Sequence, residues 1–185
     1  MMIRYHTVYG IMRGTTTYYK KRALDDYHLY SSEVLPAVKI IEKPIYYEGG
    51  STISYLYDSE NLDRIIPANE RNDGIIFKKD LQISVVGGIK DGIYCDNFYN
   101  LISCISGRIY LSIINILNPI PNADNFDDFI LTSENGIQVL VPPFYGFSFY
   151  SFTDSIIIDK MAYKSYDTVK QQKLNIDTHN INWPI

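Results

Sequence analysis

Histidine is the side chain whose ordinary pKa suits proton transfer at neutral pH, and it is also the commonest metal ligand. The chain has three histidines, His6, His28 and His179, and no two of them lie within five residues of each other. Metal sites built from histidine usually show short spacings such as His-x-His or His-x-x-x-His. The spacing therefore predicts three surface histidines and no bound metal.

Motifs for covalent catalysis and phosphate binding are missing as well. The sequence has no Gly-x-Ser-x-Gly elbow and no Cys-x-x-Cys pair, and its two cysteines, Cys95 and Cys104, are expected to be buried free thiols. The glycines of residues 87–92 are not followed by a helical pattern, so a phosphate-binding loop is not supported. Carboxylates are scattered, and the adjacent pair Asp127 and Asp128 is interpreted as a solvated strand edge.

Aromatic side chains give the strongest compositional signal, since tyrosine alone supplies 17 of the 185 residues. Tyrosine is favoured on pleated, half-buried surfaces, so this content favours a β-rich fold. In residues 144–152 the aromatic residues alternate, with Phe147 and Phe149 on one face of a strand and Tyr150 and Phe152 on the other. Such a strip can stack on a sugar ring, but filling the interior of a barrel is the simpler interpretation.

Length and charge narrow the class of protein further. A chain of 185 residues with 46% hydrophobic and 21% charged residues fits one globular domain. The net charge of -4 argues against a nucleic-acid partner or a membrane surface, because both favour basic faces. No apolar run approaches the roughly 18 residues of a membrane span, and residues 1–14 lack the apolar stretch of a secretory signal. We therefore expect a cytoplasmic protein.

Short β patterns must position these residues, and they begin after a polar start. Residues 1–33 are only weakly periodic and are assigned to an N-terminal extension, while residues 34–185 are expected to form one all-β domain. Turn signals recur roughly every eight to twelve residues, which is typical of sandwiches and barrels. One short helix is predicted over Ser59–Ile65, with Ser59 as its N-cap. Strands are expected at residues 38–41, 52–57, 75–86, 101–105, 109–116, 129–132, 137–141, 147–152 and 156–161.

Short turns join three pairs of these predicted strands. Ser106-Gly107 and Glu134-Asn135-Gly136 are turn sequences of the kind found in β-hairpins, and a third turn falls between residues 152 and 156. We therefore predict three hairpins.

The order of several short motifs resembles that of the dTDP-4-dehydrorhamnose 3,5-epimerase family, which includes heptose epimerases of surface-polysaccharide synthesis. The resemblance runs from about Pro36 to Pro184. The segments that carry it are residues 36–44 for the family's opening strand, 47–50 for its acidic-Arg-Gly turn, 88–94 for GVLRGLH, 100–107 for KLVRVVxG, 131–135 and 141–143 for LSxxN and the approach to IPPGFAHGF, and 181–184 for IDWP.

The resemblance implies a cupin-type jelly-roll barrel that forms a homodimer, needs no cofactor and binds a nucleotide sugar in a pocket inside the barrel. The family removes a proton beside a ketone with a histidine base, and Tyr94 stands at that position. The family's acid tyrosine falls near Asp159, so neither catalytic residue is intact. The substrate-binding positions expected in this chain are Asp91, Asn100, Lys79, Tyr110 and Phe147.

Tyr94 is a poor replacement for a histidine base. A base that works at neutral pH needs a pKa near 7, whereas tyrosine titrates near 10, a difference of about three units or roughly 4 kcal/mol. An enolate also needs hydrogen-bond donors or positive charge, and Arg108 is the only arginine after Arg71. Lys79 or Lys90 would have to supply the missing charge.

Three functions remain open from the sequence. The first is a catalytically silent homologue, which is a structural or regulatory partner of an active sugar-modifying enzyme. The second is an altered epimerase or isomerase of a nucleotide-linked 4-keto sugar, in which Tyr94, Asp159 or Asp91 takes a new role. The third is a carbohydrate-binding module that uses the aromatic strip of residues 144–152.

Overall fold

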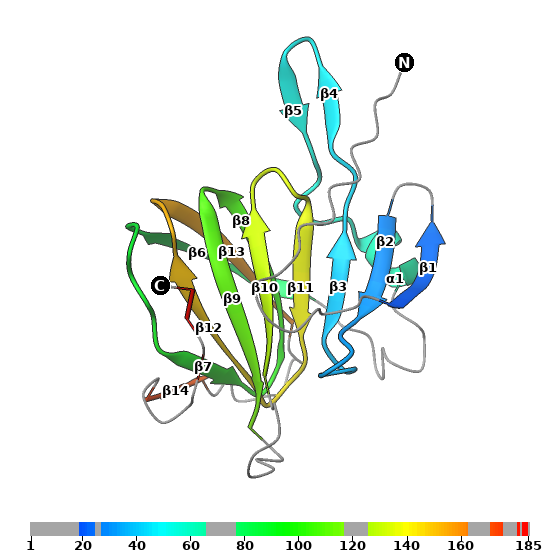
Figure 1. Ribbon diagram of the computed structural model, residues 1–185. Helices are drawn as coiled ribbons and strands as arrows, with labels where there is room; N and C mark the ends of the chain where they lie inside the picture. Colours follow the sequence, from blue (N-terminus) through cyan, green and yellow to red (C-terminus); the bar gives the residue numbers. More distant parts are fainter. Residues whose placement is uncertain are drawn as a thin grey trace.

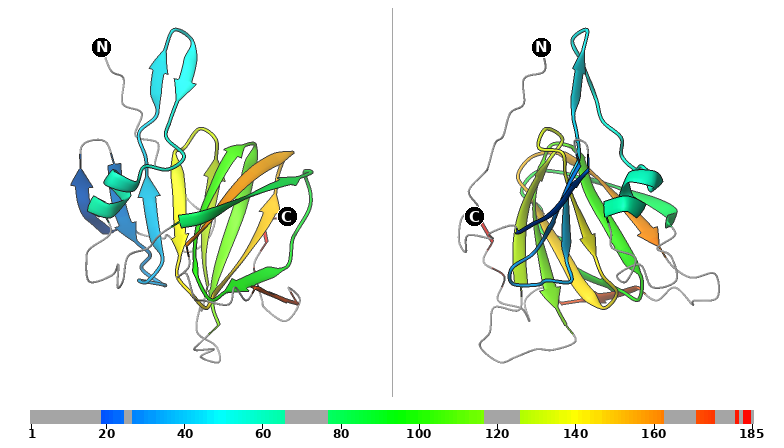
Figure 2. Two further views of the ribbon diagram at one scale, coloured as in Figure 1. Left: turned by 180° about the vertical axis from the view of Figure 1, so that it is seen from behind. Right: turned by 90° about the vertical axis from the view of Figure 1, so that its right-hand side faces the viewer.

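The computed structural model describes residues 19–24, 27–65, 77–116, 126–162, 171–175, 181 and 183–184. Within these residues the chain is almost entirely β-structure, with two antiparallel sheets that face each other as a jelly-roll barrel (Figure 1). A short hairpin projects from one end of the barrel, and a short helix lies beside the larger sheet (Figure 2). The predicted all-β, jelly-roll fold class is confirmed.

The larger sheet has seven strands in the order β1-β2-β3-β11-β8-β13-β6, and the smaller sheet has five in the order β10-β9-β12-β7-β14. The larger sheet comprises β1 Tyr19–Leu24, β2 Tyr27–Ser31, β3 Lys39–Glu42, β11 Ile137–Val141, β8 Tyr99–Ser106, β13 Ser155–Ala162 and β6 Phe77–Val85. The smaller sheet comprises β10 Phe126–Thr132, β9 Arg108–Asn115, β12 Tyr145–Ser151, β7 Ile93–Asp96 and β14 Gln171–Leu174. The projecting hairpin is made of β4 Tyr46–Glu48 and β5 Ser51–Ile53.

The three predicted hairpins are wrong, although the strands and turns exist. Each predicted turn joins β8 to β9, β10 to β11 or β12 to β13, but the two strands of each pair lie in opposite sheets. The chain turns a corner of the barrel at each of these points. At the first corner Gly107 has a φ of 79°, and a Cβ on it would lie 2.4 Å from the carbonyl oxygen of Asp154. Only glycine fits this corner without strain.

The predicted helix is present as α1, Ser59–Ile65, but its N-cap is one residue earlier than expected. Asp58 accepts a hydrogen bond from the amide of Asn61 at 3.2 Å, and its carbonyl accepts one from Leu62 at 2.9 Å. Ser59 is therefore the first helical residue and Asp58 is the cap. Leu62 is buried against Ile41 and its neighbours on the outer side of the larger sheet.

Part of the N-terminal extension is continuous with the barrel. Strand β2 pairs with β3, with Leu29 opposite Ile41, and β1 pairs with β2 at the edge of the larger sheet. Residues 1–18 lie outside the described residues. No helix among the described residues is long and apolar enough to cross a membrane.

The main core lies between the two sheets. The side chains that fill it come from both sheets and are almost completely inaccessible to water. Each large apolar side chain buried in this way contributes roughly 1.5–3 kcal/mol relative to an exposed one, so this interior holds the barrel together. Its largest completely buried members are Phe129, Phe149, Ile40, Ile102, Ile109, Leu111 and Ile113.

The carboxyl pair that we interpreted as a solvated strand edge is buried. Strand β10 is an edge strand, but Asp127 and Asp128 are only 4% and 8% exposed. Asp127 accepts a hydrogen bond from the hydroxyl of Ser32 at 2.5 Å, and burial raises the pKa of Asp128. A carboxylate can be buried when another segment of the chain donates a hydrogen bond to it, and its local sequence does not show this.

The histidine prediction is also corrected for His28, the one histidine among the described residues. His28 is half-buried on β2 and its ring stacks on Tyr30 at 6.3 Å between centroids. Its Nδ1 is buried and has no hydrogen-bond partner among the described residues. His6 and His179 lie outside the described residues.

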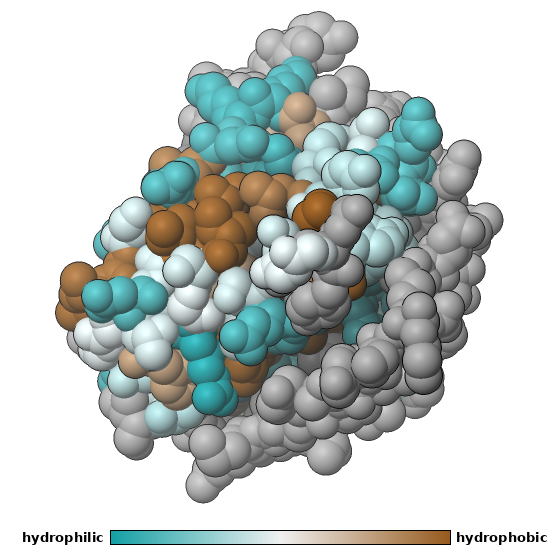
Figure 3. Space-filling view, turned by 90° about the horizontal axis from the view of Figure 1, so that it is seen from above, coloured by the Kyte–Doolittle hydropathy of each residue, from teal (hydrophilic) through white to brown (hydrophobic). Residues whose placement is uncertain are grey.

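Some apolar side chains stay exposed. Figure 3 shows a compact apolar group bordered by hydrophilic side chains on the end of the barrel seen from above. Isolated exposed apolar residues are normal on a protein surface. Those exposed by more than two fifths are Val34, Ile53, Tyr55, Leu56, Leu81, Val86, Ile89 and Phe144.

Candidate functional site

Strand β7 places Tyr94 on the inner side of the smaller sheet. Side chains alternate along a strand, so Tyr94 and Asp96 share one face while Ile93 packs with the apolar cluster on the other. Tyr94 is directly opposite Phe147 of β12, and their ring centroids are 5.6 Å apart. The position assigned to the family's base is therefore held against the main core.

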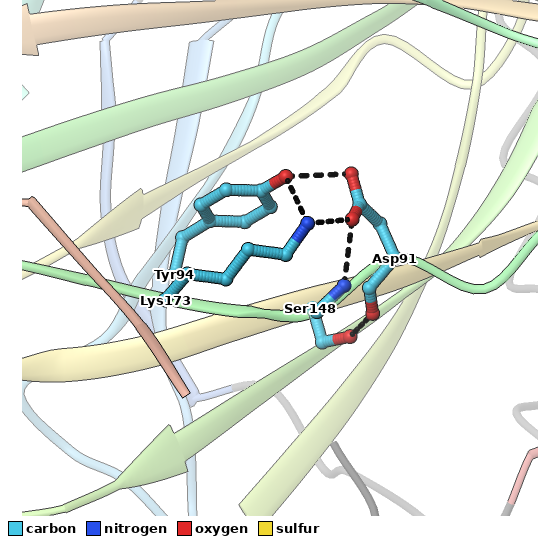
Figure 4. Close-up of polar contacts among 5 residues, drawn as sticks. Asp91, Tyr94, Ser148 and Lys173 are labelled. Atoms are coloured by element: carbon cyan, nitrogen blue, oxygen red, sulfur yellow. Dashed lines mark hydrogen bonds and ion pairs between the residues drawn. The ribbon is translucent and has the colours of Figure 1, made fainter. Parts of the chain in front are cut away.

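The hydroxyl group of Tyr94 takes part in a small polar network (Figure 4). It donates to Oδ2 of Asp91 at 2.7 Å, and Nζ of Lys173 contacts Oδ1 of Asp91 at 2.8 Å and the Tyr94 hydroxyl at 3.3 Å. The amide of Gly92 also donates to Oδ1 of Asp91 at 2.7 Å. The backbone carbonyl of Asp91 accepts a hydrogen bond from the Ser148 hydroxyl at 2.8 Å, which fixes this loop on β12.

The network raises the pKa of Tyr94 and lowers the pKa of Asp91. Burial and the hydrogen bond to Asp91 raise the pKa of Tyr94, and Lys173 offsets only part of that effect. Partial burial pushes the pKa of Asp91 upward, but hydrogen bonds from Lys173, Tyr94 and Gly92 outweigh it, so this pKa lies below its ordinary value. At neutral pH Tyr94 is consequently a neutral phenol that donates a hydrogen bond to the Asp91 carboxylate.

A second polar cluster crosses the barrel from β7 to the larger sheet. The side-chain amide of Asn100 on β8 donates to Oδ2 of Asp96 at 2.9 Å and to both carboxylate oxygens of Asp159 on β13, at 3.1 and 3.0 Å. All three residues are at most 2% exposed. One amide thus links carboxyl groups that belong to opposite sheets.

Asp159 is the group in this cluster whose proton affinity suits neutral pH. Burial raises its pKa, the hydrogen bond from Asn100 lowers it and the neighbouring Asp96 raises it, and together these effects bring the pKa to about 7. A carboxyl with such a pKa can both accept and release a proton under physiological conditions.

The other predicted substrate-binding residues do not all join these clusters. Tyr110 lies on the outer face of β9, where its ring is 5.9 Å from that of Trp183. Lys79 is exposed on β6, opposite Met161 of β13. The structure therefore brings Tyr94 together with Asp91 and Phe147, and Asn100 together with Asp159, while Tyr110 faces away from both groups.

The aromatic strip of β12 mainly fills the protein. Phe147 and Phe149 are 3% and 1% exposed and belong to the core between the sheets. Tyr150 and Phe152 lie on the outer face and pack edge to face at 5.2 Å. The inner face of the strip is therefore not open to a glycan.

Two residues of these clusters are absent from the sequence prediction. Lys173 lies 79 residues after Tyr94 and reaches it only because β14 pairs with β7. No local pattern marks such a contact. Asp96 carried a usable signal, because strand alternation places residue i+2 on the same face as Tyr94.

The described residues hold no group of three or more potential metal ligands among histidine, cysteine and carboxylate side chains. Cys95 and Cys104 are free thiols, as expected, although Cys95 is only half-buried. Burial raises the pKa of Cys104 to about 11, so it is an unreactive thiol at neutral pH.

Comparison with solved structures decides the fold family. The barrel matches a dTDP-6-deoxy-D-glucose-3,5-epimerase from Legionella pneumophila, in complex with dTDP-4-keto-L-rhamnose, with a TM-score of 0.71 and 17% identity over 86% of this chain and 84% of that one. It matches the dTDP-4-dehydrorhamnose 3,5-epimerase of Sulfolobus tokodaii with a TM-score of 0.70 and 16% identity over 86% and 87% of the two chains. It also matches the dTDP-4-dehydrorhamnose 3,5-epimerase of Bacillus anthracis, solved with TDP and pyrophosphate bound. The TM-score is 0.68 and the identity 19%, over 86% of this chain and 91% of that one.

The chain has the fold of the nucleotide-sugar 3,5-epimerases. No family model matches its sequence, and no curated protein sequence does either. Identity below one fifth with these enzymes makes the chain a divergent example of the fold. The resemblance seen in the order of sequence motifs is therefore confirmed in three dimensions.

Proposed function

We propose that this chain is a divergent homologue of nucleotide-sugar 3,5-epimerases that does not catalyse epimerisation and acts as a partner of an active sugar-modifying enzyme in surface-polysaccharide synthesis. One observation carries the proposal. The phenol of Tyr94, which the sequence resemblance assigns to the position of the family's base, donates a hydrogen bond to Asp91 and has a raised pKa.

The chemistry of proton removal supports this view. A base must accept the proton from the carbon beside the ketone, and a phenol whose pKa is raised above 10 accepts it poorly near pH 7. The enolate oxygen that follows needs positive charge nearby. The ammonium group of Lys173 is already paired with Asp91, whose carboxylate would repel an enolate.

Solvent deuterium exchange tests the proposal directly. The protein is incubated in D2O with a dTDP-4-keto-6-deoxy sugar, and proton NMR follows the signals at carbons 3 and 5. We expect no loss of either signal beyond the protein-free control, while an active 3,5-epimerase in a parallel sample exchanges both. Catalytic exchange by this chain would overturn the proposal.

A second candidate is an altered epimerase in which Asp159 is the base, and the pKa of about 7 of this buried carboxyl favours it. Its activity would rise as the pH rises through 7, because only the ionised carboxylate accepts a proton. Asn100 would then be a positioning residue that holds both oxygens of Asp159.

The same exchange assay separates the two candidates. If Asp159 is a base, wild-type protein exchanges the sugar protons with an apparent pKa near 7, Asp159→Asn abolishes exchange and Tyr94→Phe retains it. Exchange that persists in the folded Asp159→Asn variant would reject this second candidate.

A further inference from the structure

Strand β14 is an edge strand with a limited attachment. It has four residues, Gln171–Leu174, and it pairs with β7 alone among the described strands. Lys173 is opposite Tyr94 in this ladder, and the side chain of Lys173 is 58% exposed. Two side chains of β14 reach the barrel wall: Leu174 packs against the apolar cluster around Ile93 on the outer face, and Lys173 makes the polar contacts with Asp91 and Tyr94.

The loop before β7 contacts Lys173 closely through Asp91 and Gly92. The ammonium group contacts the carboxylate of Asp91 at 2.8 Å and lies 5.1 Å above the ring centroid of Tyr94. The methylene chain of Lys173 passes over Gly92, where a Cβ would lie only 2.4 Å from Cε of the lysine. Because the φ of Gly92 is not positive, the space for Lys173 explains the glycine better than backbone geometry does.

We propose that β14 is a displaceable strap, latched onto the barrel by Lys173 at Asp91, Gly92 and Tyr94. Ion pairs with this much solvent exposure contribute little free energy and are screened by salt. A short edge strand held in this way opens by a local transition while the core between the sheets stays intact.

Opening the strap would change what the barrel presents to a partner. The Asp91 carboxylate loses its counter-ion, the Tyr94 hydroxyl loses the ammonium group beside it, and the edge of β7 is left with unpaired backbone groups. An unpaired strand edge is a template for another strand. The strap therefore controls whether this edge is available, whether or not the interior of the barrel performs chemistry.

Hydrogen–deuterium exchange of the intact protein tests the latch through the backbone amides of residues 93–96. Lys173→Ala removes the anchor, and Gly92→Ala displaces it without altering any charged group. We expect both variants to raise the exchange rate of the β7 amides that bond to β14 by roughly two- to fivefold, the range that an exposed ion pair supports. Gln172→Ala, a change at the neighbouring exposed position, should leave the rate unchanged.

Two further readouts keep the experiment decisive. Amides of β9 in the core must keep the wild-type rate, and 1 M NaCl must accelerate β7 exchange in the wild type but not in Lys173→Ala. Wild-type exchange rates at β7 in both variants would overturn the proposal. So would acceleration of β7 and β9 together, since it would mean that the barrel opens as one unit.

Discussion

At the scale of single residues, two aspartates on opposite sides of the barrel show how partners decide proton affinity. The pKa of Asp91 lies below its ordinary value because Lys173, Tyr94 and Gly92 donate hydrogen bonds to its carboxylate. The pKa of Asp159 rises to about 7, because it is buried beside a second carboxyl with one amide as its partner in the cluster. Both are predicted pocket positions, but they serve different chemistry.

The buried carboxyl of Asp159 should make stability depend on pH. Between about pH 4 and pH 7 the folded protein keeps a proton on Asp159 that the unfolded chain has lost, so the free energy of unfolding falls as the pH rises through this window. We expect Asp159→Asn to gain stability over the wild type at pH 8 by roughly 1 to 4 kcal/mol, because it removes a buried charge.

Urea unfolding at pH 5 and pH 8 measures this effect, and the difference between wild type and variant isolates Asp159 from other titrating groups. Equal differences at the two pH values would show that Asp159 titrates like an ordinary surface carboxyl.

The sequence could predict part of the candidate site. The resemblance carried by the ordered motifs assigned Tyr94 and Phe147 to one pocket, and the structure has their rings in contact. The partners that control Tyr94 could not be predicted, because Lys173 arrives from an edge strand far along the chain. Tyr110 was assigned to the pocket but lies on the outer face of β9. When both faces of a strand are apolar, the sequence does not show which face points inward.

At the scale of elements, the corner between β8 and β9 requires glycine for two separable reasons. Gly107 and Gly88 both have a positive φ, at 79° and 83°, but only Gly107 would bring a Cβ against a neighbouring backbone. We expect Gly88→Ala to lower the free energy of unfolding by about 1 kcal/mol through backbone strain alone. Gly107→Ala should lower it by about 3 kcal/mol or more, because strain and the clash with Asp154 add.

Thermal and urea unfolding of the two alanine variants provide the comparison. Equal losses at Gly107 and Gly88 would mean that the corner relaxes around the new methyl group.

The start of α1 offers a second matched pair. Asp58→Ala removes the side chain that accepts from the amide of Asn61 and should lower the free energy of unfolding by about 1 kcal/mol. Ser59→Ala, one residue later, should change it by only a few tenths of a kcal/mol, because the structure places Ser59 inside the helix. A larger loss at Ser59 than at Asp58, measured by urea unfolding, would restore Ser59 as the cap.

Elements were more predictable than their pairing. Turn residues and alternation located β8, β9, β11, β12 and β13 closely, because these signals are local. The three hairpins failed because a turn signal reports a reversal of the chain and says nothing about which sheet the next strand joins. Burial of Asp127 depended on Ser32, a residue that is remote in the sequence.

At the scale of the whole molecule, the unequal sheets bear on assembly. Strands β1 and β2 extend the larger sheet beyond the facing smaller one (Figure 1). Because the uncovered part of a sheet is suited to packing against another subunit, we propose that the chain forms a homodimer. Light scattering after size exclusion should give about twice the chain mass of 21.4 kDa. A mass equal to one chain at micromolar concentration would contradict this proposal.

The corner turns that send successive strands into opposite sheets also bear on how fast the barrel can assemble. Strand β3 pairs with β11, and β8 pairs with β13 instead of with its successor β9. Many ladders therefore join segments that are far apart in the sequence. Closing such large loops before any contact forms is entropically slow, which places barrels of this kind among the domains that fold in milliseconds to seconds. During that interval the apolar faces of both sheets are uncovered, and a newly made chain is then most exposed to aggregation.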